Sequence, residues 1–175
     1  GETEFVGIAV ADAKHLERLH SHIKKSGILI NSLKSPLFHD DSFAINDPDG
    51  HQMLFGRPQE LPGPTDPKPG NLQHVVFATT NLNRIVSFYT DKLGFKISDI
   101  VHEEDTGDQT ACFLRSDQMH HTVAFFRAPE VKLDHFAHEA NCWNDIRDWG
   151  DHFASLHVEI VWGAGRHGAG NNLFI

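Results

Sequence analysis

The sequence has few of the features that place a protein outside the cytoplasm or in a membrane. It contains only two cysteines, Cys112 and Cys142, and they lack the spacing of a disulfide scaffold. No apolar run approaches the roughly 20 residues of a membrane span, and no N-terminal signal pattern is visible. We therefore expect a cytoplasmic protein with reduced thiols.

Basic residues are also scarce. The chain has 15 Lys and Arg residues against 24 Asp and Glu residues, which gives a formal net charge of −9. A surface of this sign argues against a nucleic acid or an anionic membrane as the main partner. The length of 175 residues is enough for one ordinary domain or two small ones.

Histidine is the residue that stands out, with 14 copies in the chain. Four of them lie in the segment DQMHHTVAFFRAPEVKLDHFAHEA, which runs from Asp117 to Ala140 and is read as two strands. Histidine is useful where a metal ion or a proton must be handled near neutral pH. The abundance suggests a metal site, although scattered surface histidines would give the same count.

One order of elements recurs along the chain. Apolar alternation predicts strands at EFVGIAVAD, LQHVVFATT and LDHFAHEA, and a helix with apolar residues at helical spacing follows each of them. Three more strands follow the first helix, at ILINSLKSPLF, SFAIND and HQMLFG, and three follow the second. After the third helix we expect strands at HVEIVWG and GNNLFI. A βαβββ unit of about 60 residues thus repeats, which predicts an α+β fold.

A proline-rich segment separates the first copy from the rest. The stretch RPQELPGPTDPKPGN, from Arg57 to Asn71, holds five prolines and two glycines. Proline fixes φ and has no backbone donor, so this segment should be extended and outside any sheet. We therefore place a module at 1–57, a linker at 58–70 and a second domain at 71–175.

Two histidines occupy equivalent positions in successive copies. The copies align on Val6, His74 and His135, which are 68 and 61 residues apart. If two modules pack about a pseudo-two-fold axis, the imidazoles of His74 and His135 converge on one point. Two neutral imidazoles suit Fe(II), Mn(II) or Zn(II). The alternative is two unrelated histidines at strand starts.

The pattern resembles the vicinal oxygen chelate superfamily, the group of glyoxalase-like and extradiol dioxygenase folds. The resemblance covers nearly the whole chain, and its most specific pieces are LQHVVFATTNLNRIVSFYTDKLGF, HHTVAFF, LDHFAHEA and GRHGAGNNLF. Together they look like the catalytic half of a type I extradiol ring-cleavage dioxygenase. The resemblance implies paired βαβββ modules in half-barrel mixed sheets, with a catalytic domain at 71–175 and a non-catalytic module at 1–57.

The resemblance also implies a third metal ligand, a glutamate on the last strand of the final module. The corresponding positions are Leu54, 48 residues after Val6, and Ala124, 50 residues after His74. The same offsets from His135 lead to positions 183 or 185, beyond the last residue of the chain. We therefore expect the glutamate outside this chain and a catalytic domain that is incomplete at its C-terminal end. The first module has the apolar residues Val6 and Leu54 at its two ligand positions, so we expect it to be a copy without a metal site.

The resemblance assigns proton chemistry to His121. It implies a histidine that begins the motif H-[DT]-x-A-[FL] and lies fourteen residues before the second ligand. His121 lies 14 residues before His135. Such a histidine can take a proton from a catechol and assist O₂ chemistry. Strand alternation would point His120 and His138 away from the faces of His121 and His135. A structural strand histidine is the alternative.

His167 lies in the glycine-rich stretch GAGRHGAGNN, where the backbone can approach a ligand closely. The resemblance implies that this histidine lines the substrate pocket, and an exposed loop histidine is the alternative. The stretch does not match the phosphate-binding or dinucleotide-binding patterns.

The resemblance as a whole implies an extradiol dioxygenase, an oxidoreductase that inserts O₂ into a catechol-type aromatic diol at a non-haem Fe(II), or possible Mn(II), centre. It implies a homo-oligomer whose partners are the small-molecule diol and O₂. Two alternatives stay open. One is another metalloenzyme of the same superfamily, an isomerase or lyase, and the other is a metal-free small-molecule binding module of the bleomycin-resistance type.

Overall fold

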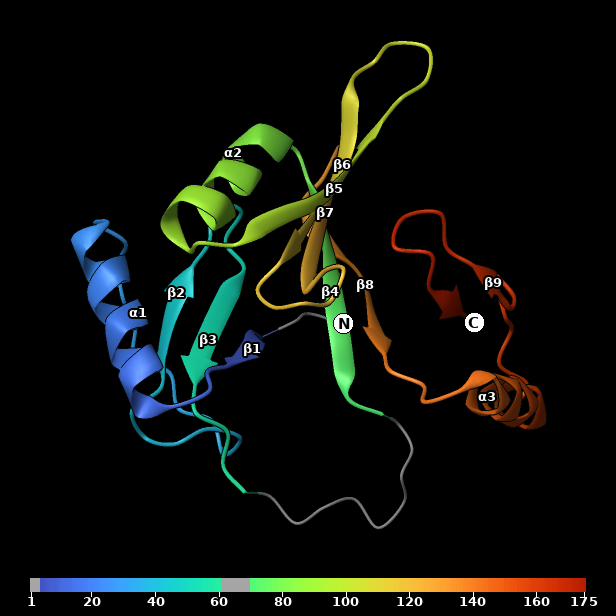
Figure 1. Cartoon of the computed structure of the whole chain (residues 1–175), viewed down its shortest axis with the longest axis horizontal. Coiled ribbons are helices and arrows are strands. Elements are labelled where there is room, and N and C mark those ends of the chain that lie inside the picture. The colour runs from blue at the N-terminus through green and yellow to red at the C-terminus, as the bar shows by residue number, and fades with distance from the viewer. Residues whose placement is uncertain (1–3, 61–69) are drawn as a thin grey trace. The chain divides into compact units, whose positions relative to one another are not determined.

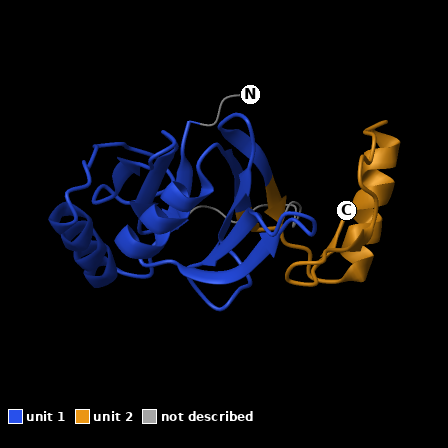
Figure 2. Cartoon of the chain, turned by 90° about the horizontal axis from the view of Figure 1, so that it is seen from above, with its two compact units in different colours: residues 1–63, 75–135 blue, residues 64–74, 136–175 orange. Residues whose placement is uncertain are grey.

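The structure is a computed structural model that describes residues 4–60 and 70–175 (Figure 1). The central part of the predicted linker at 58–70 lies outside these residues. The chain divides into two compact units, coloured separately in Figure 2: Gly1–Gly63 with Val75–His135, and Pro64–His74 with Phe136–Ile175.

The first βαβββ copy forms a three-stranded sheet with the strand order β1-β3-β2 and one helix. β1 pairs with β3 in parallel and β2 pairs with β3 in antiparallel fashion. The helix begins after Asp12, whose carboxylate accepts a hydrogen bond from the backbone amide of His15 at 2.8 Å. The helix is amphipathic, and Leu16 and Ile23 on its apolar side are buried. The elements are β1 (Val6–Ala9), α1 (Ala13–Lys25), β2 (Phe43–Asn46) and β3 (Gln52–Gly56).

The strand predicted at 28–38 is wrong. This segment is a loop, and among the described residues it is joined to its surroundings by isolated bridges rather than by a ladder. Its apolar residues do not lie on one alternating face, because the covered positions change phase from Ile28 and Ile30 to Leu33 and then to Phe38. A strand requires both a partner strand and a consistent buried face.

The second copy contributes β4 to β7 to the larger sheet, and the third copy contributes its first strand, β8, in the strand order β5-β6-β7-β4-β8. β4 and β7 run parallel, whereas β5 with β6 and β6 with β7 run antiparallel. The predicted α+β fold with mixed sheets is therefore confirmed. The strands are β4 (Leu72–Thr79), β5 (Lys96–His102), β6 (Gln109–Arg115), β7 (Val123–Arg127) and β8 (Lys132–His138).

The helix predicted at 81–94 is confirmed, with a change of winding that the sequence does not reveal. α2 (Leu82–Ser87) continues directly into the π-helix η1 (Phe88–Lys92). A π turn holds more residues per turn than an α turn and therefore rotates the side chains that follow. In this case Tyr89 is completely buried.

One hydrophobic core joins the two copies within the first unit. The first copy contributes Ile23 and Met53, and the second contributes Ile85 and Phe125, all of them completely buried. Burying apolar area of this kind is the main favourable term in folding. The two copies thus fold onto shared apolar contacts, and the domain boundaries proposed at the linker stay a prediction.

Among its described residues, the second unit contains the helix α3, a short two-stranded ladder and the ends of β4 and β8. α3 (Trp143–Ser155) begins after Cys142, and the Asp145 side chain accepts hydrogen bonds from the backbone amides of Asn141 at 2.8 Å and Cys142 at 3.3 Å. This carboxylate satisfies amides that the helix itself leaves unpaired. The ladder is formed by β9 (Gly165–Arg166) and β10 (Leu173–Phe174), which run antiparallel.

The strand predicted at 157–163 is wrong. His157 has a φ of 56°, in the left-handed region that ends extended structure. The apolar residues that produced the pattern are exposed, up to 92% for Val161. Hydrophobic content suggested a strand here, but among the described residues no neighbouring strand pairs with the segment.

Both cysteines are free, as the sequence predicted. Burial, with a smaller contribution from the negative charge of Asp99, raises the pKa of Cys112 to about 11, so its thiol stays protonated at neutral pH. None of the helices in the described part of the chain is long and apolar enough to cross a membrane.

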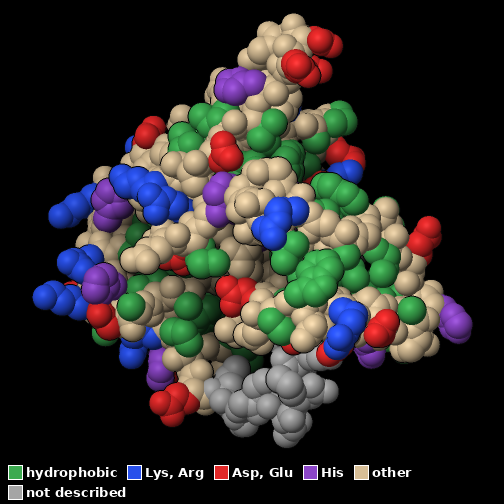
Figure 3. All heavy atoms as spheres, turned by 45° about the vertical axis from the view of Figure 1, so that its right-hand side comes forward, with side chains coloured by type: hydrophobic (Ala, Val, Ile, Leu, Met, Phe, Trp, Pro, Cys, Tyr) green, Lys and Arg blue, Asp and Glu red, His purple; other side chains and the backbone are tan. Residues whose placement is uncertain are grey.

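Positive charge is concentrated on α1 despite the acidic net charge. Lys and Arg side chains gather on the left of the view in Figure 3, and the last turn of α1 carries His22, Lys24 and Lys25. Cations near a helix C-terminus interact favourably with the helix dipole. The predicted site residues lie on other elements, so this surface is best explained as a solvated helix face.

The turn after β2 ties the first copy to the second through a buried carboxylate. Asp47 is 5% exposed, and its Oδ1 accepts hydrogen bonds from the backbone amides of Asp49 and His51, both at 2.9 Å. The hydroxyl of Tyr89, in η1 of the second copy, donates to Asp47 Oδ2 at 3.1 Å. Burial raises the pKa of Asp47 above its usual value, since the hydrogen bonds and His51 offset only part of the lost hydration.

The raised pKa of Asp47 predicts how stability changes with pH. The folded protein binds this proton more tightly than the unfolded chain, whose carboxyl has a pKa of about 3.9. The contribution of Asp47 to the free energy of unfolding should therefore decrease as pH rises from about 4 through the raised pKa. Asp47→Asn cannot ionise. The free energy of unfolding of the variant, measured by urea denaturation relative to the parent, should rise across that window. A flat or falling difference would contradict this assignment.

Candidate functional site

β4 separates two faces of the larger sheet. Val75 and Phe77 belong to the hydrophobic core, whereas Val76 and Ala78 alternate with them and point to the opposite side. His74 lies two residues before Val76 in the same strand, so strand alternation gives it the face of Val76. The first predicted ligand is thus directed away from the core.

A row of residues crosses the sheet on this opposite side. In the ladder register, Val76 of β4 pairs with Ala124 of β7, Ala124 pairs with Phe113 of β6, and Phe113 pairs with Asp99 of β5. Register partners point to the same side of a sheet. We call the side defined by Val76, Ala124, Phe113 and Asp99 the second face. It is apolar along most of the row and ends in a carboxylate.

The two predicted metal ligands lie in different compact units. His74 belongs to the second unit, is half-buried, and its Nδ1 is in hydrogen-bond contact with the side-chain oxygen of Gln73. His135 lies in β8 within the first unit, is exposed, and its Nδ1 is 2.7 Å from Asp134 Oδ2. A carboxylate on one imidazole nitrogen orients the ring and is common for histidines that bind a metal through the other nitrogen.

The donor set of the described residues fits a metal ion only in part. Two imidazoles are the right ligand type for a divalent transition metal. In the described ranges, 4–60 and 70–175, no group of three or more His, Cys, Asp or Glu side chains is arranged to hold a metal ion. The glutamate expected beyond Ile175 remains a prediction.

His121 is buried and is paired with its neighbour. Its side chain is 4% exposed, and its Nδ1 lies 2.9 Å from Nδ1 of His120. Both rings contact Phe113, with ring centroids 5.0 Å apart for His121 and 5.5 Å apart for His120. The prediction that His120 points away from His121 is therefore wrong. β7 begins only at Val123, so the two histidines lie in a bend where strand alternation does not apply.

Asp99 is a residue that sequence reasoning missed, and His120 is one that it directed to the wrong side. Nε2 of His120 lies 3.7 Å from Asp99 Oδ2, within ion-pair range. The two consecutive histidines were a sequence signal from which an interaction between their side chains could have been predicted. No local signal indicated Asp99, because its position depends on the pairing of β5 with β6.

His167 lies in the second unit, just after β9. Its backbone amide donates to the Asn172 carbonyl at 2.7 Å, and its Nδ1 lies 2.8 Å from the Ala169 carbonyl oxygen. Its half-buried ring has aromatic neighbours in Trp162 and Phe174, at centroid distances of 6.2 and 6.1 Å. These contacts orient the imidazole. Its role toward a substrate stays a prediction.

His138, in β8 of the second unit, is exposed, and its Nδ1 lies 2.7 Å from the Gly70 carbonyl oxygen. The contact gives this histidine a structural partner. It makes His138 a suitable control for substitutions at His135, three residues earlier in the same strand.

The structure corrects the alignment of the first copy. Val6 belongs to the core side of its sheet, as Val75 does in the second copy. Gly7 pairs with Leu54 as Val76 pairs with Ala124, so the position equivalent to His74 is Phe5 rather than Val6. The sequence alignment was one residue out because the two modules differ in length. The conclusion that this copy lacks ligand side chains is unchanged.

In the first copy, an aromatic side chain fills the face of the smaller sheet that corresponds to the second face of the larger sheet. Phe5 and Leu54 pack in a separate apolar cluster around Phe38. The Phe38 ring lies so close to Gly7 and Gly56 that a Cβ on Gly56 would be 2.7 Å from its Cγ. The glycines are required by this close approach of ring to backbone. The first copy is therefore a packed module without room for a ligand on this face.

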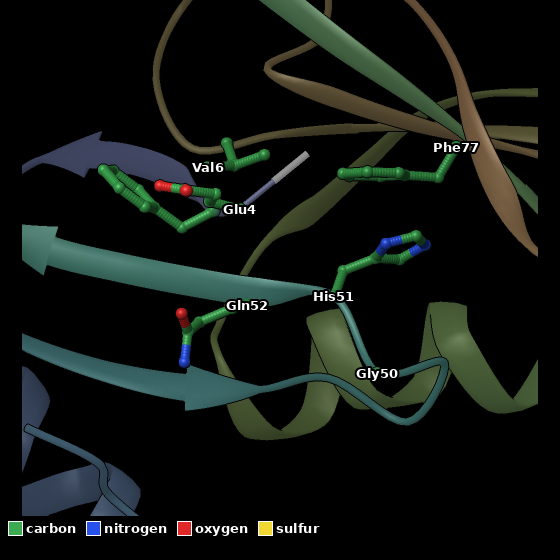
Figure 4. Close-up of a pocket in the computed structure, with 7 residues that line it drawn as sticks. Glu4, Val6, Gly50, His51, Gln52 and Phe77 are labelled. Atoms are coloured by element: carbon green, nitrogen blue, oxygen red, sulfur yellow. The ribbon is translucent and has the colours of Figure 1, made fainter. Parts of the chain in front are cut away.

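A small cavity lies beside the first copy, away from the predicted site residues. It has a volume of about 80 Å³ and includes His51, whose ring stacks on Phe77 with centroids 4.0 Å apart (Figure 4). This volume suits a few water molecules rather than an aromatic substrate. The lining residues are Glu4, Phe5, Val6, Gly50, His51, Gln52 and Phe77.

Comparison with known proteins gives a consistent family. A family model described as the Glyoxalase/Bleomycin resistance protein/Dioxygenase superfamily matches residues 71–175. The chain is 28% identical over 160 residues to biphenyl-2,3-diol 1,2-dioxygenase of Paraburkholderia xenovorans, an alignment that covers 81% of this chain and 54% of the relative. It is 27% identical to 3-methylcatechol 2,3-dioxygenase of Pseudomonas putida, covering 93% of this chain and 62% of the relative. The chain thus spans roughly half to three fifths of these relatives.

Solved structures share the fold. A Mn(II)-bound glyoxalase from Novosphingobium aromaticivorans superimposes with a TM-score of 0.78 at 27% identity, covering 98% of this chain and 57% of that one. A 2,3-dioxygenase from a Pseudomonas species gives a TM-score of 0.79 at 22% identity, covering 95% and 64%. At this identity the second likeness establishes the fold alone.

We expect Gly56→Ala to destabilise the protein. The added Cβ would collide with the buried Phe38 ring, and overpacking of this kind costs about 1–3 kcal/mol in the free energy of unfolding. Gly168→Ala is the matched control, because a Cβ there meets nothing within 4 Å. Urea denaturation of both variants measures the difference. Combining Gly56→Ala with Phe38→Leu should recover part of the loss, and equal stability of the two single variants would refute the filled-module interpretation.

Proposed function

Because the chain belongs to the Glyoxalase/Bleomycin resistance protein/Dioxygenase superfamily, we propose that it is an extradiol ring-cleavage dioxygenase for a catechol-type aromatic diol. The observation that carries the proposal is the buried His121, held against Phe113 on the second face of the larger sheet. The names of the two curated relatives, both aromatic-diol dioxygenases, support it. A metal-free binding module has no need of a buried imidazole that is paired with a second one.

We propose that His74 and His135 provide two ligands to a divalent metal, and that a glutamate beyond Ile175 provides the third. The corrected alignment of the first copy, from Phe5 to Leu54, changes one offset to 49 and leads to positions 184 or 185. A metal bound there would orient the diol and O₂ and stabilise developing negative charge. Fe(II) is the metal we favour, and Mn(II) is supported by the glyoxalase neighbour.

The residues of this chain suit the remaining chemistry. His121 can accept a hydroxyl proton from the diol, which leaves an oxygen with more electron density for the reaction with O₂. Val76, Ala124 and Phe113 are buried, so they form an apolar layer on the second face from which water is excluded. In the net reaction the C–C bond beside the diol breaks, and both oxygen atoms of O₂ enter the product. His167, oriented by its aromatic neighbours, is proposed to contact the substrate.

A second candidate is an isomerase or lyase of the same superfamily. The likeness to a Mn(II)-bound glyoxalase at 27% identity is the observation that favours it. Such an enzyme would bind the metal and consume no O₂. The free thiols and the acidic net charge support a cytoplasmic location for either enzyme.

We expect His135→Ala to lose metal and His138→Ala to retain it. Loss of a direct ligand should weaken Fe(II) binding by more than about 100-fold, because even outer partners of ligands cost 10–100-fold. The experiment uses protein that includes the sequence after Ile175, loaded with Fe(II) without oxygen. Iron content is measured after desalting, and catechol turnover by the yellow ring-opened product and by O₂ consumption.

The controls separate the candidates. Equal iron content in the two variants would remove His135 from the ligand set. Iron-loaded protein that oxidises no catechol would exclude the dioxygenase, and metal binding without O₂ consumption would favour the isomerase or lyase. Protein that binds no metal would point to a binding module.

A further inference from the structure

We propose that His120 and Asp99 form a fixed array with His121, in which His120 is a positioning residue that holds the His121 imidazole in one orientation and one tautomer. The array comprises the contact between Nδ1 of His120 and Nδ1 of His121 at 2.9 Å and the contact between Nε2 of His120 and Asp99 Oδ2 at 3.7 Å. The inference rests on the proposed proton-accepting role of His121, which it deepens.

The backbone around the two histidines is anchored on both sides. The Thr122 amide donates to the Leu114 carbonyl at 2.8 Å, and the Thr122 carbonyl accepts from the Val75 amide at 3.2 Å. The Thr122 hydroxyl oxygen also accepts from the Ser116 amide at 3.1 Å. The bend is therefore tied to β4 and β6 at once. This fixes the direction in which both imidazoles leave the backbone.

A break in the β5 register supplies the carboxylate. Between Ile97 and Asp99 the pairing with β6 shifts, so that Ile97 pairs with Leu114 and Asp99 with Phe113. Such a bulge re-aims the side chains that follow it. Without the shift, Ser98 would stand opposite Phe113. The bulge thus brings Asp99 to the second face, on which Phe113 contacts both histidine rings.

The hydrogen-bond chemistry of the array selects a tautomer. A hydrogen bond between two Nδ1 atoms requires a proton on one of them and a lone pair on the other. At 3.7 Å the Asp99 carboxylate is an electrostatic partner rather than a hydrogen-bond acceptor, and its charge favours the proton of His120 on Nε2, the nitrogen that faces it. His120 Nδ1 then accepts from Nδ1–H of His121. The lone pair of His121 is consequently on Nε2, which is the nitrogen that would act as the base.

Burial supports a directed array rather than a chance contact. His121 is 4% exposed, whereas the side chains of His120 and Asp99 are 22% and 44% exposed. The array therefore runs from a buried imidazole to a partly hydrated carboxylate. In a site of low polarity an oriented partner has a larger effect on tautomer than it has in water.

The test separates hydrogen bonding from packing. His120→Asn retains a polar atom near the position of Nδ1, and His120→Leu retains bulk without it. Asp99→Asn removes the charge while keeping a similar shape. His138→Leu, at an exposed histidine elsewhere, is the control substitution. Long-range proton–nitrogen spectra of the ¹⁵N-labelled chain identify which ring nitrogen of His121 carries the proton, and they require neither metal nor activity.

We expect the Nδ1–H tautomer of His121 in the parent, in His120→Asn and in the control. We expect a mixture or the opposite tautomer in His120→Leu and Asp99→Asn. In active protein, His120→Leu should lower kcat by about 10–100-fold, part of the 10²–10⁴ that a positioned acid–base group contributes, with little change in KM. His120→Asn should recover most of this loss.

An unchanged His121 tautomer in both His120→Leu and Asp99→Asn would overturn the inference, as would an Nε2–H tautomer in the parent. If His120→Leu does not fold, Asp99→Asn still decides between these results. Parent protein that oxidises no catechol would contradict the proposed function instead. The spectra would still show whether His120 and Asp99 determine the tautomer of His121.

Discussion

The parallel pairing of β4 with β7 is the constraint on which the candidate site depends. It fixes the register of Val76 against Ala124, and the antiparallel neighbours then carry the same row to Phe113 and Asp99. Because side chains alternate along each strand, one side of this sheet packs in the core, and the other carries the row of residues at which the site is proposed. A shift of one residue in β4 would exchange the two sides and bury His74 in the core.

The two copies in the first unit show two uses of one architecture. Each pairs its first strand in parallel with its last, and each contributes to the shared core. In the first copy, Phe38 packs onto Gly7 and Gly56 and fills the face that corresponds to the second face of the larger sheet. In the second copy that face carries small and aromatic side chains and the His120–His121 pair. The repeat therefore combines a module at which a site is proposed with a module whose corresponding face is filled by packing.

The family resemblance implied the mixed sheets, whereas local sequence patterns predicted the repeat and the helices, because apolar periodicity reports directly which side of an element is buried. They failed at 28–38 and 157–163, where apolar residues do not pair as strands. They also misaligned Val6 by one residue and directed His120 away from His121. Both errors concern register and strand ends, which depend on partners distant in the sequence. The bulge that brings in Asp99 is likewise invisible without the pairing of β5 and β6.

The central claim is that this protein supports insertion of molecular oxygen into an aromatic diol. Turnover of a catechol under ¹⁸O₂, followed by mass spectrometry of the product, tests it most directly. The account predicts a ring-opened product that carries two ¹⁸O atoms, formed by Fe(II)-loaded protein and lost in His121→Ala. A catechol that is recovered intact, or a ring-opened product without ¹⁸O, would contradict it.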